Sequence, residues 1–303
     1  MLSMNQLQSP LTGSTDVIKQ SVLDIPTVKA KYIKELNTDV SRFFENVSEL
    51  AIYQCQTSKL KFYYPFSVVS DGQFYADLAK YYKGYYNLWR WEHQRVIEMI
   101  QPQEKVLEVG CGRGYFLQKL LEKQAIPTGL DFNEDAIEEG KKMGVTILNQ
   151  TIKEHAQSHP ESYDSVCAFQ LFEHVNEVGD FLKDTVKCLK KGGLLAIGVP
   201  NNDSYYFKND PYHTLNLPPH HMLLWDKNSL AYIAKMFDLE IVEIVNQPVS
   251  SLHRGMLYKL WLQNILGDNF LSKIITIGTR FAVKRLPFFN NQGITVVATY
   301  RKK

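Results

Sequence analysis

The central part of the chain alternates short apolar runs with amphipathic stretches. Val106–Val109 and Val145–Leu148 are apolar runs of strand length. Tyr115–Gln124, which has helical spacing, follows the first run. A second helical stretch precedes the other run; it starts after Asn133, a favoured N-cap, and stops before Gly144, a residue type favoured after helices. Such alternation predicts an α/β fold with a mostly parallel sheet. Two later runs are also predicted strands: Glu240–Asn246 and Ile294–Tyr300.

Three glycines at alternate positions directly follow the first predicted strand. Gly110, Gly112 and Gly114 stand in the sequence Val-Leu-Glu-Val-Gly-Cys-Gly-Arg-Gly, between a strand and a helix. Glycine permits positive φ and lets a ligand approach the backbone N–H groups closely. The third glycine of the dinucleotide motif Gly-x-Gly-x-x-Gly is missing in every plausible register. The spacing therefore favours a nucleoside ligand without a pyrophosphate.

An acidic residue ends the next predicted strand. Gly-Leu-Asp at 129–131 places Asp131 about twenty residues after the glycines, where its carboxylate can accept hydrogen bonds from two ribose hydroxyls. Asp131 could instead cap the following helix, but Asn133 is better placed for that role. Glu108, just before the glycines, is expected either to contact an amino group of the ligand or to brace the loop.

With these residues the chain resembles the class I S-adenosylmethionine-dependent methyltransferases, in particular those that act on sugars and other small molecules. The likeness continues in family order through residues 163–175, which resemble the fourth strand and its acidic-His turn, and residues 189–201, which resemble the fifth strand. It covers about residues 105–201. It implies a three-layer α/β/α Rossmann-like fold, with a seven-stranded, mostly parallel sheet and an antiparallel last strand. It also implies S-adenosyl-L-methionine as cofactor and S-adenosyl-L-homocysteine as product.

The resemblance also assigns contacts around the loop. The turn after the fourth strand carries Glu173 and His174; a structural role is favoured for Glu173, and His174 is a candidate substrate contact. The expected cofactor contacts are Glu108, Gly110, Cys111, Gly112, Gly114, Asp131, Phe132 and Gln170.

Additional segments precede the methyltransferase-like domain. We expect residues 1–72 to form an N-terminal arm and a hairpin cap, and residues 73–303 to form the domain. Residues 1–30 are low in aromatic side chains and predict a loosely docked arm, whereas residues 52–65 alternate like a β-hairpin. Some sugar methyltransferases carry a zinc lobe with paired Cys-x-x-Cys motifs here. Only Cys55 is present, with Ser58 at the partner position, so we predict no metal.

Aromatic side chains concentrate between residues 74 and 100, in a stretch with helical spacing. Most of these rings are expected to pack helices onto the sheet. The corresponding region covers the site in related methyltransferases. Tyr82, Tyr86 and Trp89 are therefore candidate substrate or cofactor contacts.

Two adjacent histidines follow two prolines in the loop after the fifth strand. Pro218 and Pro219 stiffen the backbone before His220 and His221. An imidazole is mostly a base at neutral pH, and methyl transfer to an O–H group needs a proton acceptor. We therefore predict His221 as general base and His220 as second choice, with His213 less favoured and Glu173 or His174 as more distant candidates. The alternative is a histidine that orders the loop. In resembling sugar methyltransferases an aromatic residue follows such a histidine, which makes Trp225 a candidate substrate contact.

A helical insertion at about 250–290 precedes the last strand. Six Lys and Arg side chains face one acidic side chain, Asp268, between residues 252 and 290. The apolar stripe Phe270, Ile274, Ile277, Phe281 lies opposite the basic residues Lys273, Arg280, Lys284. Three interpretations of 252–289 compete: a lid on the substrate pocket, a homodimer surface, or a helix in weak contact with a membrane surface.

Composition limits the remaining possibilities. The 303 residues, 45% hydrophobic, can bury a large core, and the net charge of +2 gives no basic field for nucleic acid. The four cysteines lack metal-ligand spacing. A polar N-terminus and the lack of a long apolar run predict a cytoplasmic protein.

The sequence therefore predicts methyl transfer to a hydroxyl or amine of a small molecule, such as a sugar, a surface-glycan precursor or a secondary metabolite. One alternative is a lipid-like quinone precursor, which the basic insertion would help to recruit. Another is a catalytically silent S-adenosylmethionine-binding module. RNA or protein methylation is disfavoured because the chain lacks a basic face and an Asn/Asp-Pro-Pro-Tyr motif.

Overall fold

A seven-stranded sheet forms the centre of the computed structural model, which describes residues 7–81, 89–267, 269, 274–275 and 292–303. The strand order is β10-β11-β8-β7-β4-β5-β6. Strands β4 to β8 run parallel, whereas β11 is antiparallel to both β8 and β10. The predicted sheet with its antiparallel last strand is confirmed. The strands are β4 (Lys105–Val109), β5 (Ile126–Leu130), β6 (Thr146–Leu148), β7 (Tyr163–Phe169), β8 (Leu189–Pro200), β10 (Leu239–Asn246) and β11 (Thr295–Lys302).

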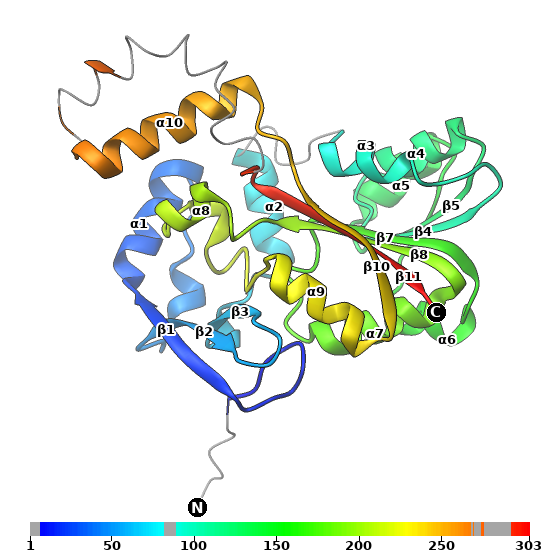
Figure 1. Cartoon of the computed structure of the whole chain (residues 1–303), viewed down its shortest axis with the longest axis horizontal. Coiled ribbons are helices and arrows are strands. Elements are labelled where there is room, and N and C mark those ends of the chain that lie inside the picture. The colour runs from blue at the N-terminus through cyan, green and yellow to red at the C-terminus, as the bar shows by residue number, and fades with distance from the viewer. Residues whose placement is uncertain (1–6, 82–88, 268, 270–273, 276–291) are drawn as a thin grey trace, which may run out of the picture.

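Helices cover both faces of this sheet, as predicted for a three-layer fold. Figure 1 shows one group of helices above the sheet and a second group below it. The first group is α3 (Trp91–Ile97), α4 (Tyr115–Glu122) and α5 (Glu134–Lys142). The second is α6 (Ile152–Ser158), α7 (Val178–Cys188) and α9 (Lys227–Met236). Apolar side chains from both layers bury the strands, so only the strand ends and the sheet edges reach the surface.

A second, smaller sheet lies beside the first, at the lower left of Figure 1. Its order is β1-β2-β3-β9 and every pair is antiparallel. The predicted hairpin is confirmed as β2 (Leu50–Cys55) and β3 (Lys61–Tyr64). β9 (Leu223–Leu224) comes from the loop after β8 that carries His220 and His221, here called the histidine loop, so the N-terminal cap shares its sheet with the part of the chain that follows β8.

The prediction of a loosely docked arm is wrong for residues 17–30. These residues form β1 (Val17–Leu23) and most of α1 (Ile25–Leu36), which Asp24 caps by accepting a hydrogen bond from the Thr27 N–H. β1 is an edge strand whose side chains are mostly exposed, including the apolar Ile18 and Val22. Its order comes from backbone hydrogen bonds to β2, and its apolar residues do not alternate as they do in a strand with one buried face.

Two buried tyrosines connect the N-terminal part to the histidine loop. The Tyr32 hydroxyl donates to the Leu217 carbonyl oxygen at 2.8 Å, and the Tyr63 hydroxyl donates to the Asn216 carbonyl oxygen at 3.1 Å. The cap therefore holds the loop that carries the histidines.

Tyr32→Phe is expected to lower the free energy of unfolding by about 1 kcal/mol, because one buried hydrogen bond is lost while the ring remains. Urea denaturation measures the change. Tyr64→Phe is the matched control, because Tyr64 is exposed, and it should leave stability unchanged. Equal stability of Tyr32→Phe and the wild type would show that this hydrogen bond does not hold the cap.

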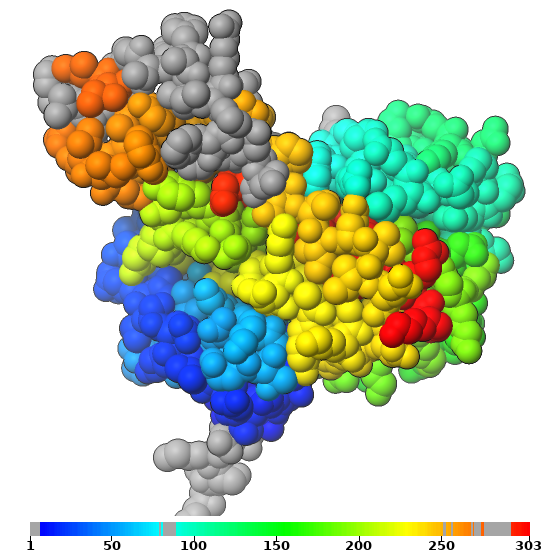
Figure 2. All heavy atoms as spheres, viewed as in Figure 1, coloured from blue at the N-terminus to red at the C-terminus, as the bar shows by residue number. Residues whose placement is uncertain are grey.

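The start of the predicted insertion is a long helix, α10 (Ser251–Leu266). Leu257 and Trp261 of α10 pack in one apolar cluster with Tyr205 and Tyr206 of the short helix α8 (Tyr205–Asn209). In Figure 2 the orange α10 lies directly above the yellow-green α8. The predicted apolar stripe and the basic residues opposite it lie outside the described residues, except for Ile274, which is half-exposed.

The other short elements complete the fold. Helix α2 (Gly72–Tyr81) packs through Phe74 and Leu78 into the core. Short 3-10 turns are present at Ser41–Phe44, Phe66–Val68 and Thr214–Asn216. Within the described ranges, no helix is both long enough and apolar enough to span a membrane.

Candidate active site

Four polar segments meet at the carboxyl edge of the parallel strands. β4 leads into the glycine loop, β5 into Asp131, β7 into Gln170 and β8 into Asn201. Ligands of open α/β sheets bind at this edge.

The glycine loop has the backbone that its sequence predicts. Gly110, Gly112 and Gly114 have φ values of +71°, +51° and +75°, which lie in the region that favours glycine. A Cβ atom at Gly110 would lie 3.0 Å from the Leu171 side chain, whereas one at Gly112 would meet no atom within 4 Å. Gly110 is therefore needed for packing, and Gly112 faces open space where a ligand can approach the backbone.

Asp131 holds the loop and retains acceptor capacity. Its Oδ2 accepts a hydrogen bond from the Gly112 N–H at 2.7 Å, and its Oδ1 accepts one from the Asn133 N–H at 2.9 Å. Each oxygen of an ionised carboxylate has a further lone pair for a ligand hydroxyl. Asn133 caps α5 by accepting from the Ala136 N–H, as predicted. The ribose contact of Asp131 stays a prediction.

Glu108 is a buried carboxylate beside this loop. Burial, and to a lesser extent the Asp131 charge, raise the pKa of Glu108 well above its usual value. Its Oε2 has no hydrogen-bond partner among the residues that the structure describes. A ligand amino group would satisfy that oxygen, so the loop, Asp131 and Glu108 fit the S-adenosylmethionine that the resemblance implies. Of the other predicted contacts, Cys111 is buried and Phe132 is exposed beside Asp131.

Sequence reasoning missed a polar network around Gln170. The Gln170 side-chain amide donates to Glu92 Oε1 at 3.2 Å, and Arg90 Nη1 lies 3.9 Å from the same oxygen. Glu92 is buried, and burial raises its pKa. The Arg90 charge partly opposes the burial-driven rise in pKa of both Glu108 and Glu173, so its field reaches the glycine loop and the turn after β7. The only signal in the sequence is the pair of opposite charges, Arg90 and Glu92, at the start of the helix that precedes β4.

Three histidines lie together beyond this network. The ring centroid of His174 is 4.8 Å from that of His220 and 4.9 Å from that of His221, while His220 and His221 stack at 4.3 Å. Burial lowers the pKa of all three, to about 4 for His174 and well below the usual value for the other two. The three imidazoles, here called the histidine cluster, are therefore neutral at pH 7.

Glu173 lies next to the histidine cluster and is fully buried. Neither of its carboxylate oxygens has a hydrogen-bond partner within the described ranges. Burial raises its pKa to about 8. Its backbone carbonyl accepts from the N–H groups of Met222 and Leu223 at 2.8 and 3.0 Å, which joins the turn after β7 to the histidine loop. A purely structural role was favoured for Glu173, but two unpartnered buried oxygens are more than that role requires.

The glycine loop and the histidine cluster are neighbours. Leu171 packs against Gly110, and Glu173 and His174 follow in the same short turn. One turn of chain therefore separates the expected cofactor site from the histidines, which places both at one edge of the sheet.

The other candidate substrate contacts are less well supported. Tyr82 and Tyr86 lie outside the described residues. Trp89 is exposed, and its ring packs against His93 and Phe116. Trp225 is fully buried beside Phe172 in the core, so the structure does not support the predicted substrate contact. It directly follows β9 and packs in the main hydrophobic core.

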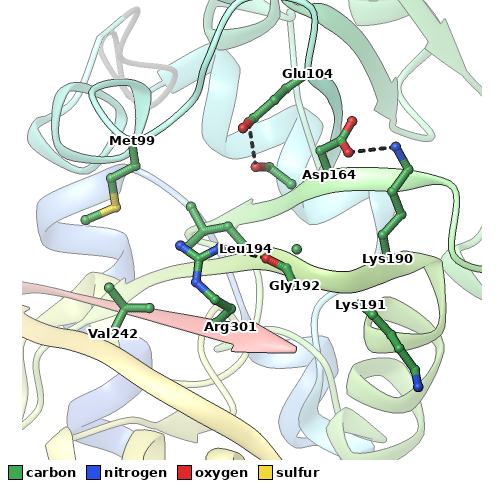
Figure 3. A pocket seen from close by; sticks show the side chains of 11 residues that line it. Met99, Glu104, Asp164, Lys190, Lys191, Gly192, Leu194, Val242 and Arg301 are labelled. Atoms are coloured by element: carbon green, nitrogen blue, oxygen red, sulfur yellow. Dashed lines mark hydrogen bonds and ion pairs between the residues drawn. The ribbon is translucent and has the colours of Figure 1, made fainter. Parts of the chain in front are cut away.

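A cavity of about 280 Å³ lies away from these groups. Figure 3 shows its charged lining, where Lys190 forms an ion pair with Asp164 at 2.6 Å. Glu104 accepts from Ser165, and Arg301 donates to the Gly192 carbonyl. These residues lie at the amino-terminal ends of β4, β7 and β8 and, because β11 is antiparallel, near the carboxyl-terminal end of β11. The cavity is therefore opposite the candidate site, and Lys190 and Asp164 in its lining neutralise each other.

Comparisons with known proteins agree with this geometry. A model of the methyltransferase-domain family matches residues 80–244, more than half of the chain. The chain is 32% identical over 114 residues to the ubiquinone biosynthesis O-methyltransferase of Vibrio atlanticus, covering 34% of this chain and 47% of that protein. The corresponding Yersinia pestis protein is 30% identical over 110 residues, covering 34% and 45%. The match thus spans about half the length of these curated relatives. A solved S-adenosylmethionine-dependent methyltransferase from Archaeoglobus fulgidus has a TM-score of 0.52 at 21% identity, over 69% of this chain and 90% of that one, and shows the fold alone.

Proposed function

The chain belongs to the methyltransferase-domain family, and from this premise we propose that it transfers a methyl group from S-adenosylmethionine to a hydroxyl or amine of a small molecule. The observation that carries the proposal is the placement of the glycine loop and the histidine cluster on either side of one turn. When bound, S-adenosylmethionine supplies an electrophilic methyl group on its sulfonium. The protein then has to bind the cofactor, align the acceptor with the methyl group and remove the acceptor's proton.

The cofactor is held by groups around the glycine loop. Asp131 accepts the two ribose hydroxyls with the lone pairs that its loop contacts leave over. Glu108 accepts from the amino group of the methionine part through Oε2. Gly112 leaves the space through which the ligand reaches the backbone.

The histidine cluster receives the acceptor's proton. His221 is the base: its Nδ1 faces Asn216 Oδ1 at 3.2 Å, which leaves the Nε2 lone pair to accept the proton. As the acceptor oxygen or nitrogen forms its bond to the methyl carbon, the carbon–sulfur bond breaks and the proton moves to His221. S-adenosylhomocysteine and a protonated imidazole result.

We propose a polar acceptor, such as a sugar, a surface-glycan precursor or a secondary metabolite. Buried polar groups line this edge of the sheet, and they favour a ligand with hydrogen-bonding groups of its own. The identity with ubiquinone biosynthesis O-methyltransferases favours a second candidate, a quinone precursor, although it extends over only 34% of the chain.

Incubation with methyl-labelled S-adenosylmethionine and fractionated bacterial extract tests the proposal. Label is expected among polar small molecules; label in the lipid fraction would support the quinone-like acceptor instead. Asp131→Ala is the control for a cofactor-dependent signal. Label only in RNA or protein would contradict the proposal, and binding of S-adenosylmethionine without any transfer would indicate a silent module.

A further inference from the structure

The histidine cluster combines residues from two distant segments into a set of metal-ligand type. His174 and His220 are 46 positions apart in the sequence. One ring nitrogen from each of His174, His220 and His221 lies within 4.8 Å of the other two. Neutral imidazole is the commonest protein ligand for transition metals.

Hydrogen bonds give the three rings the same tautomer. His220 Nδ1 is 2.7 Å from the Leu215 carbonyl oxygen, and His174 Nδ1 is 2.6 Å from the His220 carbonyl oxygen. A carbonyl oxygen can only accept, so each Nδ1 carries the proton. With His221 Nδ1 facing Asn216 Oδ1, Nε2 is the acceptor nitrogen of every neutral ring. Metal-binding histidines are fixed in this way, with the second ring nitrogen donating to an oxygen.

The orientation of His221 is fixed through a chain of amides. The Asn202 amide nitrogen donates to the Pro200 carbonyl oxygen at 3.3 Å, which turns Asn202 Oδ1 toward Asn216. Asn202 Oδ1 then accepts from Asn216 Nδ2 at 2.8 Å, which turns Asn216 Oδ1 toward His221. Because the chain starts at a backbone carbonyl, each amide has one allowed orientation. The hydrogen bonds thus connect His221 to Pro200 at the end of β8.

A buried carboxylate completes the set. Glu173 Oε1 lies 3.9 Å from His174 Nε2, and both Glu173 oxygens are without hydrogen-bond partners in the described part of the chain. A buried polar group without a partner is costly, and a nearby cation would supply a partner.

We propose that His174, His220 and His221 bind one divalent transition-metal ion of the zinc type, with Glu173 beside it. Nitrogen-rich sites suit such ions, and three protein ligands leave a fourth position open. Zinc–nitrogen bonds of about 2.0–2.1 Å require the ring nitrogens to move closer than they are here, by about 1 Å or less. The sequence-based expectation of no metal concerned the cysteines, and it did not consider histidines brought together by the fold.

This inference deepens the proposed function, on which its catalytic part rests. An ion held by His174, His220 and His221 would act as a Lewis acid at its open position, where it would lower the pKa of a bound acceptor hydroxyl and so favour its attack on the methyl group. His221 is then a ligand rather than the base. The acceptor class narrows to molecules that offer a hydroxyl to the ion.

Metal titration of the chelator-treated protein tests the site without any turnover. We expect one Co²⁺ per chain with a visible absorption spectrum of tetrahedral type, and competition by Zn²⁺ in calorimetry. His174→Ala and His221→Ala should each weaken binding about 100-fold, and Asn216→Ser about 10- to 100-fold through the lost support of His221. His253→Ala, in α10, is the matched control and should bind as the wild type does.

Circular dichroism shows whether each variant is folded. Binding weaker than about 1 mM in the wild type, or equal binding in His174→Ala and His253→Ala, would overturn the metal site. Methyl transfer is measured separately with labelled cofactor. Transfer that continues after metal removal would overturn the catalytic role of the ion and leave the proposed function standing. Metal binding without any methyl transfer would contradict the proposed function and leave the metal site standing.

Discussion

His221→Ala is expected to lower turnover by about 100-fold or more at saturating S-adenosylmethionine, the usual cost of losing a positioned acid–base group. Cofactor affinity should change less than about two-fold, because His221 lies across the turn from the glycine loop. Turnover of a labelled acceptor fraction and calorimetric titration with S-adenosylhomocysteine measure the two effects. A metal ligand and a base predict the same loss of turnover, and the Co²⁺ titration distinguishes them.

His253→Ala serves as the control for His221→Ala, since it removes an imidazole from α10 outside the cluster. If His221→Ala lost cofactor binding and turnover to the same degree, His221 would be a residue that orders the loop. Unchanged turnover in His221→Ala would exclude it from the chemistry.

Asp131→Ala is expected to weaken S-adenosylmethionine binding by about 10- to 100-fold, since hydrogen bonds to a charged group contribute about 1.5–3 kcal/mol. The variant removes the ribose acceptor and also the Oδ2 contact that holds the Gly112 N–H. Calorimetry with S-adenosylhomocysteine measures the loss.

Two further variants make the Asp131 result specific. Asp131→Asn keeps one acceptor oxygen for the loop or the ribose and should lose less affinity than Asp131→Ala. Asp135→Ala removes an exposed carboxylate in the first turn of α5 and should bind normally. Equal affinity of Asp131→Ala and Asp135→Ala would contradict the ribose assignment.

Local signals made the cofactor side of the site predictable. The turn from β4 into α4 needs positive φ at Gly110, Gly112 and Gly114, and this requirement is visible in the residue types alone. Asp131 and Asn133 could be separated in role because an N-cap has a fixed distance from its helix. The antiparallel last strand followed from the family resemblance rather than from spacing.

Long-range contacts made the rest unpredictable. β1 exposes most of its side chains and its apolar residues do not alternate, so its pairing with β2 leaves no strand pattern in the sequence. Trp225 looks the same in sequence whether it faces a ligand or the core, and only the pairing of β9 with β3 decides for the core. His174 joins His220 and His221 because the β7 turn and the histidine loop share backbone hydrogen bonds at Glu173.

The polar network of Arg90, Glu92 and Gln170 could not be predicted from the sequence for the same reason. Glu92 and Gln170 are 78 positions apart, and their hydrogen bond forms only when α3 packs beside the end of β7. Arg90 gains its influence on Glu108 and Glu173 from that packing. Charged residues at the start of a helix, such as Arg90 and Glu92, usually indicate a solvated helix end. Only the fold shows that Glu92 is buried.

The most direct test of the account is a crystal structure of the full chain with S-adenosylhomocysteine bound. The account predicts that the ribose hydroxyls contact Asp131, that an amino group contacts Glu108, and that the sulfur atom faces the histidine cluster. A sulfur atom directed away from His174 and His221, or a cofactor bound elsewhere than the glycine loop, would contradict the claim that these groups form one methyl-transfer site.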